Sequence, residues 1–198
     1  MTGWGRVFRY ATAAVGVTAL LAGCGSGGGG GSTTAAGSPT VSAASTVAQT
    51  VPTAINGCQL PQSFITQEHL DPNPDKSDTQ SGNAVWRGCV WSTYEGDGYS
   101  VDVSTANLTI PMVQANTKFK VAEQLTIEGR QAITYHNVAE TDLRAACLLH
   151  VEMKGGGLEF SVDNPDGRKA TGTQDSCEIA KKLAADLVPT IPAPNDYN

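Results

Sequence analysis

Residues 84–105 read AVWRGCVWSTYEGDGYSVDVST, and this pattern predicts a β-hairpin. The first segment, 84–94, is rich in aromatic and β-branched residues, which favour strands. The second segment, 99–105, alternates apolar and polar residues, as a half-buried strand does. The four residues between them, 95–98, read EGDG and favour a turn.

Side chains along such a hairpin alternate between its two faces. Cys89 and Trp91 therefore share one face of the first strand, and Trp86 shares the other face with Val90. The hairpin also gathers four aromatic residues: Trp86, Trp91, Tyr94 and Tyr99. They are expected either to pack in the core or to line an apolar groove, which makes a groove beside the hairpin a candidate ligand site.

Elements on either side of the hairpin complete an α+β pattern. Short helices are predicted at 60–70 and 111–118, with a loop at 71–83 between the first helix and the hairpin. Further strands are predicted at 123–127, 131–135, 146–153 and 158–162. The sequence thus predicts an antiparallel sheet of five to seven strands, with N- and C-terminal helices packed on it.

The clearest helix begins after Asp175. Asp175 is a good N-cap and Glu178 stands three residues later, as in a capping box. An apolar stripe follows at spacings of three and four residues: Cys177, Ala180, Ala184, Leu187 and Val188. Pro189 is expected to end the helix, and Cys177 is expected to face the core.

The first 24 residues have the pattern of a lipoprotein signal. Arg6 and Arg9 form a basic start, and an uncharged stretch follows that ends in LAGC at 21–24. This resembles a bacterial lipobox, in which the cysteine is lipidated; the alternative is an ordinary secretory signal with a chance cysteine. We therefore expect a signal peptide over 1–23, export, and a lipid anchor on Cys24 at the outer face of the cytoplasmic membrane.

Domain boundaries follow from composition. Residues 25–54 hold no charge and no aromatic ring. We therefore expect 24–54 to be the lipidated cysteine followed by a disordered tether, with or without glycosylation. Residues 55–192 are expected to form one domain, and 193–198 a frayed tail.

The predicted domain holds four cysteines: Cys58, Cys89, Cys147 and Cys177. An even number in an exported chain indicates two disulfides. Three pairings are possible, and we favour Cys58–Cys89 with Cys147–Cys177, each closing a loop of about 30 residues. No C-x-x-C pair occurs, so no metal is expected.

Composition excludes two function classes. The 198 residues include 13 Lys and Arg against 19 Asp and Glu, which gives a formal net charge of −6. No clustered basic patch occurs, so nucleic acid is not an expected partner. No apolar run reaches the roughly 18–20 residues that a membrane-spanning helix needs, so a multi-span membrane protein is excluded.

The order of these features resembles the actinobacterial lipoproteins of domain-of-unknown-function family 3558. Besides the lipobox and tether, the resemblance rests on Cys58 ahead of a short helix, GCVW at 88–91, CLLHV at 147–151 and DSCEIA at 175–180. It implies an exported, lipid-anchored envelope protein with an α+β domain, and it supplies no catalytic residue. The element order is also loosely similar to envelope lipoproteins of the Mog1/PsbP-like fold, which implies a fold alone.

Catalytic motifs are sparse. His69, His136 and His150 have no partner at helical spacing, and no G-x-S-x-G, S-x-x-K or H-E-x-x-H motif occurs. The D-x-N-x-D loop at 71–75 lacks the glycine and glutamate that an EF-hand requires. No catalytic residue, metal or cofactor is therefore expected.

Three functional hypotheses follow. The leading one is a non-enzymatic envelope lipoprotein, held to the membrane by lipid on Cys24, whose domain binds a partner protein or an envelope component. The second is a carrier of an apolar ligand, a lipid or glycolipid, in a groove near the 84–105 hairpin. The third is an enzyme whose site the sequence does not reveal.

Overall fold

The structure is a computed structural model that describes residues 47–93 and 96–193. The predicted signal peptide, Cys24 and most of the predicted tether lie outside the described residues, as do Tyr94 and the last five residues. Among the described residues, no helix is both long and apolar enough to cross a membrane.

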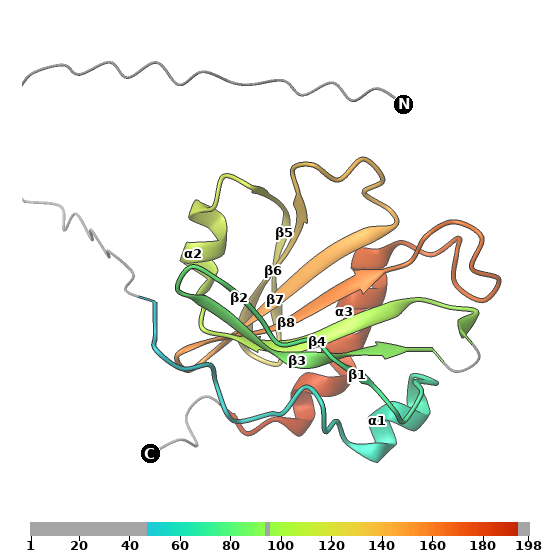
Figure 1. Ribbon diagram of the computed structural model, residues 1–198, viewed down its shortest axis with the longest axis horizontal. Helices are drawn as coiled ribbons and strands as arrows, with labels where there is room; N and C mark the ends of the chain where they lie inside the picture. The colour runs from blue at the N-terminus through green and yellow to red at the C-terminus, as the bar shows by residue number, and fades with distance from the viewer. Residues whose placement is uncertain (1–46, 94–95, 194–198) are drawn as a thin grey trace, which may run out of the picture. The chain divides into compact units, whose positions relative to one another are not determined.

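The described domain is built from strands and three short to medium helices (Figure 1). The strands are β1 (Asp75–Lys76), β2 (Thr79–Ser81), β3 (Ala84–Ser92), β4 (Ser100–Ala106), β5 (Phe119–Ile127), β6 (Arg130–Asn137), β7 (Ala146–Met153) and β8 (Gly156–Asp163). The helices are α1 (Gln62–Gln67), α2 (Ile110–Ala115) and α3 (Ser176–Leu187), followed by a 3-10 turn at Val188–Thr190.

All strand pairs are antiparallel and form one sheet in the order β1-β3-β4-β8-β7-β6-β5, with β2 also paired to β3. The insertion of β8 between β4 and β7 joins the N-terminal hairpin to the C-terminal one (Figure 1). The predicted α+β class, with helices at both ends of the domain, is confirmed.

The strand count differs from the sequence prediction. The sheet has eight strands, because β1 and β2 form along β3 in a segment predicted as loop. Every residue of these two strands is exposed, so no apolar alternation marks them in the sequence. β5 also begins at Phe119, ahead of the predicted start at 123; it is an edge strand, and its first residues alternate between half-buried and exposed.

The predicted C-terminal helix is confirmed as α3. The Asp175 carboxylate accepts hydrogen bonds from the backbone N–H groups of Cys177 at 2.8 Å and Glu178 at 3.2 Å. Its buried stripe packs on β7 and β8 and contains Cys177, Ile179, Ala180, Leu183, Ala184 and Leu187. Pro189 lies in the 3-10 turn that ends the helix.

The helices cover opposite faces of the sheet. Along β6, Ala132 belongs to the large core that includes α1 and α3, whereas Ile133 and Tyr135 belong to a smaller cluster with α2. Because neighbouring side chains of a strand point to opposite faces, α2 lies across the sheet from α1 and α3.

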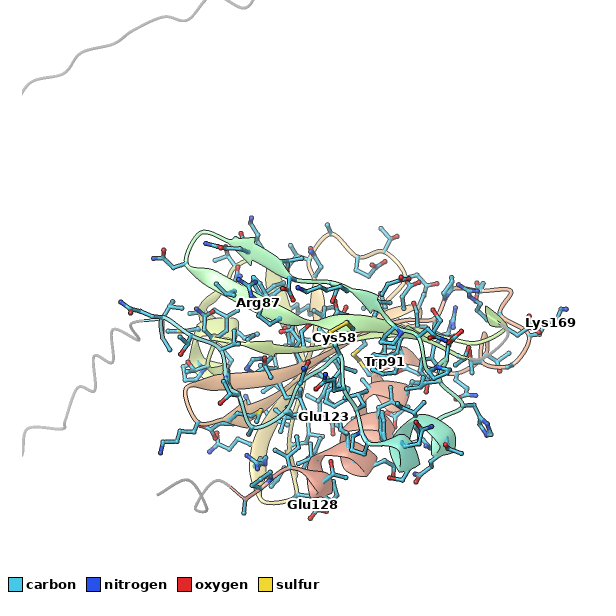
Figure 2. The ribbon with its side chains drawn as sticks, turned by 60° about the horizontal axis from the view of Figure 1, so that its bottom comes forward. Cys58, Arg87, Trp91, Glu123, Glu128 and Lys169 are labelled. Atoms are coloured by element: carbon cyan, nitrogen blue, oxygen red, sulfur yellow. A yellow bond between two sulfur atoms is a disulfide. The ribbon has the colours of Figure 1, made fainter. Side chains whose placement is uncertain are left out.

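Two disulfides staple the domain in the favoured pairing. Cys58–Cys89 joins the segment before α1 to β3, and Cys147–Cys177 joins β7 to the first turn of α3. Figure 2 shows Cys58 and Trp91 close together beside β3, where the Trp91 indole N–H donates to the Gly57 carbonyl at 2.7 Å. Gly57 also lies close to β4, where a side chain would not fit, since a Cβ there would lie 1.9 Å from the carbonyl oxygen of Val103.

Candidate functional site

A cleft of about 480 Å³ opens where four segments distant in the sequence meet. These segments are the end of α1 (67–69), the connection from β3 to β4 (93 and 97–99), the loop before α3 (170, 171 and 174), and α3 itself (179 and 182). We call it the α1–α3 cleft. Its volume falls within the range of small-molecule sites in proteins, about 300–1,000 Å³.

One edge of the cleft is the turn that ends α1. The backbone N–H of Leu70 donates to the carbonyl of Ile65 at 2.9 Å, and that of His69 donates to Thr66 at 3.3 Å, which together form a Schellman motif. His69 occupies the left-handed position of this motif, with φ of 53°, where glycine is usual. Its exposed side chain lines the cleft.

A charged network lies beside this turn. The Glu68 carboxylate, only 5% exposed, accepts hydrogen bonds from Lys182 Nζ at 2.5 and 2.7 Å. Lys182 Nζ also lies 3.0 Å from an Asp186 carboxylate oxygen. Burial alone would lower the pKa of Lys182, but its hydrogen bonds to Glu68 and Asp186 outweigh this and raise the pKa above its ordinary value. Lys182 therefore stays protonated and engaged.

Tyr99 contributes to the floor of the cleft just before β4 begins. Its side chain is almost fully buried, and this burial raises the pKa of the phenol well above its ordinary value. The negative charges of Glu68 and Asp186 raise it further. The phenol thus stays neutral, and both Tyr99 and Lys182 are suited to donating hydrogen bonds rather than to nucleophilic attack.

The loop 164–174 forms another wall and is held from within. The buried Asn164 amide donates to the carbonyls of Thr171 at 2.7 Å and Gln174 at 3.0 Å, and its carbonyl oxygen accepts from the Thr171 hydroxyl at 2.7 Å. Arg144 adds further hydrogen bonds to the loop backbone, including one to Gln174 at 3.2 Å. The loop lacks helix and strand, yet it is fixed by these side chains.

The same loop is joined to the connection between β3 and β4. The N–H of Ala170 donates to the Asp97 carbonyl at 3.0 Å, and Arg168 Nη1 donates to the Gly96 carbonyl at 2.7 Å. On the other side, the N–H of Gly98 donates to Thr93 Oγ1 at 2.9 Å. The two walls therefore support each other, and the cleft is formed before any ligand arrives.

Comparison with known proteins places this architecture in a family. The model of a family described as a protein of unknown function (DUF3558) matches residues 19–190. The chain belongs to the DUF3558 family. The match includes every helix and strand described above, and the family's description assigns no role. No curated protein and no solved structure matches the chain.

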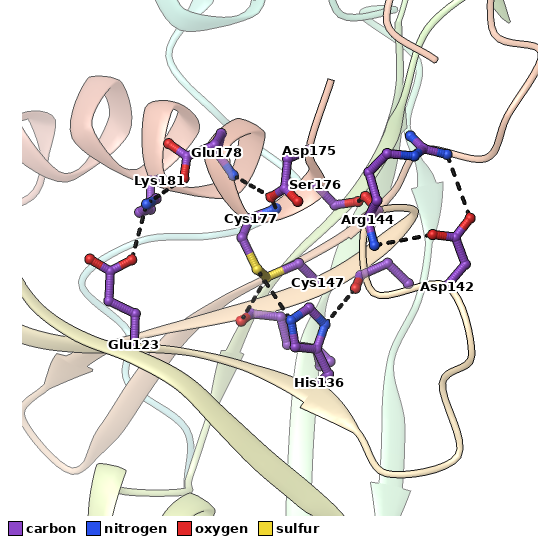
Figure 3. Close-up of a disulfide and its surroundings, with 12 residues drawn as sticks. Glu123, His136, Asp142, Arg144, Cys147, Asp175, Ser176, Cys177, Glu178 and Lys181 are labelled. Carbon is purple, nitrogen blue, oxygen red and sulfur yellow. Dashed lines mark hydrogen bonds and ion pairs between the residues drawn. A yellow bond between two sulfur atoms is a disulfide. The ribbon is translucent and has the colours of Figure 1, made fainter. Parts of the chain in front are cut away.

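The DUF3558 domain holds a second polar cluster at the Cys147–Cys177 disulfide (Figure 3). His136 Nδ1 lies 2.8 Å from the carbonyl of Ala146, and its Nε2 lies 3.7 Å from the sulfur of Cys177. The three side chains bring potential metal ligands within 4.8 Å of one another. Since the two sulfurs are bonded to each other, neither is a thiolate ligand in this oxidised state.

A third polar cluster lies on the opposite face of the sheet. Glu159 accepts a hydrogen bond from the Tyr135 hydroxyl at 2.6 Å and lies 3.4 Å from His150 Nδ1. His150 Nε2 lies 3.0 Å from the carbonyl of Leu108, so both ring nitrogens are engaged. The side chains of Tyr135, Glu159 and His150 are buried, and they connect β6, β8 and β7.

The four aromatic residues of the hairpin do not line one groove. Trp91 is 1% exposed and packs in the core, Trp86 lines a small polar hollow on the opposite face, and Tyr99 lines the α1–α3 cleft. Tyr94 lies outside the described residues. The alternation of side chains along β3 accounts for the separation of Trp86 from Trp91.

The three histidines likewise occupy separate environments: the cleft (His69), the second disulfide (His136) and the buried cluster with Glu159 (His150). Sequence reasoning missed the special position of His69. Its left-handed backbone has no signature in the sequence, because the usual marker of such a helix end is a glycine.

Proposed function

We propose that this protein is an exported lipoprotein, anchored at the outer face of the cytoplasmic membrane through lipid on Cys24, whose domain binds a ligand in the α1–α3 cleft without chemical turnover. The observation that carries the binding role is the cleft itself. Four separate segments form its walls, and hydrogen bonds fix them in place. Such preorganisation favours binding because little order is lost when a ligand enters.

Export is supported by two independent features. The LAGC tetrad at 21–24 follows a basic start and an apolar stretch, as in lipoprotein signals. All four cysteines of the described domain are paired in disulfides, which persist in oxidising compartments outside the cytoplasm.

The proposal of binding without turnover rests on the state of the polar groups in the cleft. Lys182 is protonated and held by two carboxylates, and Tyr99 is neutral. Nucleophilic and general-base catalysis need a group that can give up or accept a proton near neutral pH. These two groups instead offer hydrogen bonds. His69 also lines the cleft, but among the described residues no hydrogen bond joins its imidazole to a hydroxyl that it could activate as a nucleophile.

A carrier of an apolar ligand is the second candidate. Tyr99 and Ile179 give the floor of the cleft an apolar part, and Ala170 extends it on the loop side. For this second candidate we propose the α1–α3 cleft as the ligand site, because it lies at the end of the hairpin that contains Tyr99.

The anchor is tested by Cys24→Ala in the full chain. We expect the variant to leave the membrane fraction and to accumulate as an unprocessed or misprocessed precursor, because no acyl chain is attached. Metabolic labelling with a fatty acid measures this. Continued labelling of the variant would refute the anchor.

The binding role is tested by filling the cleft. Ala170 is exposed and lines the cleft, so Ala170→Trp places an indole in the cleft without disturbing the core. Ala185→Trp, at an exposed position of α3 outside the cleft, is the matched control. Each chain is incubated with envelope extract and examined by native mass spectrometry. We expect a bound small molecule with the wild type and with Ala185→Trp, and none with Ala170→Trp; equal adducts on all three chains would contradict the proposal.

A further inference from the structure

We propose that the ligand of the α1–α3 cleft is an uncharged, hydroxyl-rich molecule of the saccharide class, and that His69 is a residue that binds it. This inference rests on the proposed function, because it names the ligand of the same cleft. Three features of the cleft carry it: its charge balance, the hydrogen-bonding capacity of its rim, and the backbone of His69.

The charges that line the cleft leave no place for a strongly charged ligand. Lys182 is the only lysine or arginine among the described residues that line the cleft, and it is already shared by Glu68 and Asp186. An anionic ligand would have to compete with both carboxylates for it. Asp97 is the one lining carboxylate with no ion pair among the described residues, and a single exposed carboxylate is a weak site for a cation. A neutral ligand fits this balance.

The rim offers groups that can both donate and accept hydrogen bonds. Thr93 Oγ1 accepts from the Gly98 N–H and keeps its own hydroxyl proton to donate, while Thr171 Oγ1 donates to Asn164 and keeps its lone pairs to accept. Gln174 adds an exposed amide. Saccharide hydroxyls also donate and accept, so these groups complement them.

The cleft suits a sugar ring better than an acyl chain. The apolar surface of the cleft, to which Tyr99, Ile179 and Ala170 contribute, gives the C–H faces of a sugar ring a place to pack. An acyl chain would cover the polar rim without replacing the hydrogen bonds that water makes there, and such burial is unfavourable.

His69 provides the most specific argument. The Schellman turn uses only the backbone of His69, and glycine would adopt its φ of 53° with less strain. Among the described residues, none hydrogen-bonds the imidazole, so the fold does not require this side chain. Strained backbone positions are concentrated at functional sites. An exposed imidazole at the edge of the cleft is therefore best explained by contact with the ligand.

The test is an NMR titration of the full-length chain carrying Cys24→Ser, so that no lipid is attached to it. The probes are maltose, galactose, mannose and N-acetylglucosamine. We expect at least one of them to shift the amide signals of the cleft residues, with Gln174 and Ala170 among them. None of these sugars shifting any cleft amide would overturn the saccharide class.

Two substitutions test His69 with little risk of misfolding. His69→Gly suits the left-handed turn and removes the imidazole, so we expect sugar binding to weaken about tenfold, the loss of one hydrogen bond to the ligand. His69→Asn also tolerates this backbone and keeps a hydrogen-bonding group, so we expect binding within a few-fold of wild type. Unchanged binding by His69→Gly would overturn the role of His69.

A free saccharide and a glycolipid headgroup share this chemistry, and a second titration distinguishes them. Dodecyl maltoside, below its micelle concentration, is compared with maltose and with dodecyldimethylamine oxide, which has the same chain and no sugar. If maltose and dodecyl maltoside bind equally well, the ligand is a free saccharide. If dodecyl maltoside binds more tightly than both maltose and dodecyldimethylamine oxide, the ligand is a glycolipid headgroup. Equal binding of the two amphiphiles would overturn the saccharide class in favour of an apolar carrier.

This inference and the proposed function fail in different ways. If the wild type captures a molecule from envelope extract that Ala170→Trp does not, and that molecule is not a saccharide or glycolipid, the binding function stands and the saccharide inference is wrong. If neither extract nor sugars yield a ligand that Ala170→Trp excludes, both are wrong.

Discussion

The two disulfides close loops of nearly equal length but hold different kinds of structure. Cys58 and Cys89 are 31 residues apart, and Cys147 and Cys177 are 30 apart. On the loop-entropy model each bridge should therefore stabilise the fold by a similar amount, roughly 3–4 kcal/mol. Their surroundings differ far more than their loops do.

The first bridge, Cys58–Cys89, fastens an irregular segment to β3. Residues 47–60, which we call the strap, contain no helix or strand. Besides the disulfide, Trp91 holds the strap through the Gly57 carbonyl, and the Asn107 amide holds it through the Ala48 carbonyl at 2.7 Å. The α1–α3 cleft has no lining residue in the strap.

The second bridge fastens a helix that is already capped and packed. Asp175 caps α3, and its stripe is buried against the sheet. The bridge also fixes the position of the start of α3, which follows the loop 164–174 that forms a wall of the cleft. At the same place, the N–H of Ser176 donates to the Arg144 carbonyl at 2.9 Å. Two bridges of similar entropic effect therefore act on different structures: one secures the strap, and the other positions the start of α3 beside the wall of the cleft.

The largest expected effect comes from removing each bridge in turn. Cys147→Ser with Cys177→Ser, and Cys58→Ser with Cys89→Ser, should each lower the free energy of unfolding by roughly 3–4 kcal/mol. Urea unfolding measures this. Only loss of the Cys147–Cys177 bridge should also speed hydrogen exchange at the Ala170 amide, whose N–H donates to the Asp97 carbonyl. Equal exchange at Ala170 in both variants would remove the distinction between the bridges.

A smaller effect is expected from loosening the wall of the cleft directly. Asn164→Ala removes three buried hydrogen bonds and should lower the free energy of unfolding by about 2–3 kcal/mol. Asn137→Ala is the control, because Asn137 is exposed and its side chain accepts one hydrogen bond, from Ala139 at 3.0 Å; we expect a change within about 0.5 kcal/mol. Similar losses in the two variants, by urea unfolding, would mean that the loop is not held by Asn164.

The smallest expected effect is a change in how the stability of the fold depends on pH, and it tests the burial of Tyr99 at the cleft floor. Because the folded state raises the pKa of Tyr99, the stability that the neutral phenol contributes is complete below about pH 10 and declines as pH rises further. Tyr99→Phe lacks this group, so its urea midpoint should fall less steeply than that of the wild type above about pH 10. Parallel profiles would show that Tyr99 is not buried as described.

Much of the fold could be predicted because its signals are local. The alternation in 99–105 and the Asp175 cap mark β4 and α3, and the favoured disulfide pairing is confirmed. β1 and β2 could not be predicted, because they are stabilised by pairing with β3 and carry no buried side chains.

The candidate site could be predicted only in part. The sequence marks Tyr99 as one aromatic of a possible groove, and Tyr99 lines the cleft. The other lining residues come from segments as far apart as Glu68 and Lys182, and only the folded chain brings them together. The left-handed backbone of His69 likewise depends on how α1 ends, which the residue type does not disclose.

The most direct test of the cleft as the functional site is His69→Gly, measured for stability and for ligand capture from envelope extract in the same preparation. If His69 serves the ligand rather than the fold, glycine should raise the free energy of unfolding by about 0.5–1 kcal/mol and reduce the bound small molecule seen by native mass spectrometry. A variant that is less stable than the wild type, or that captures the ligand equally well, would contradict this assignment.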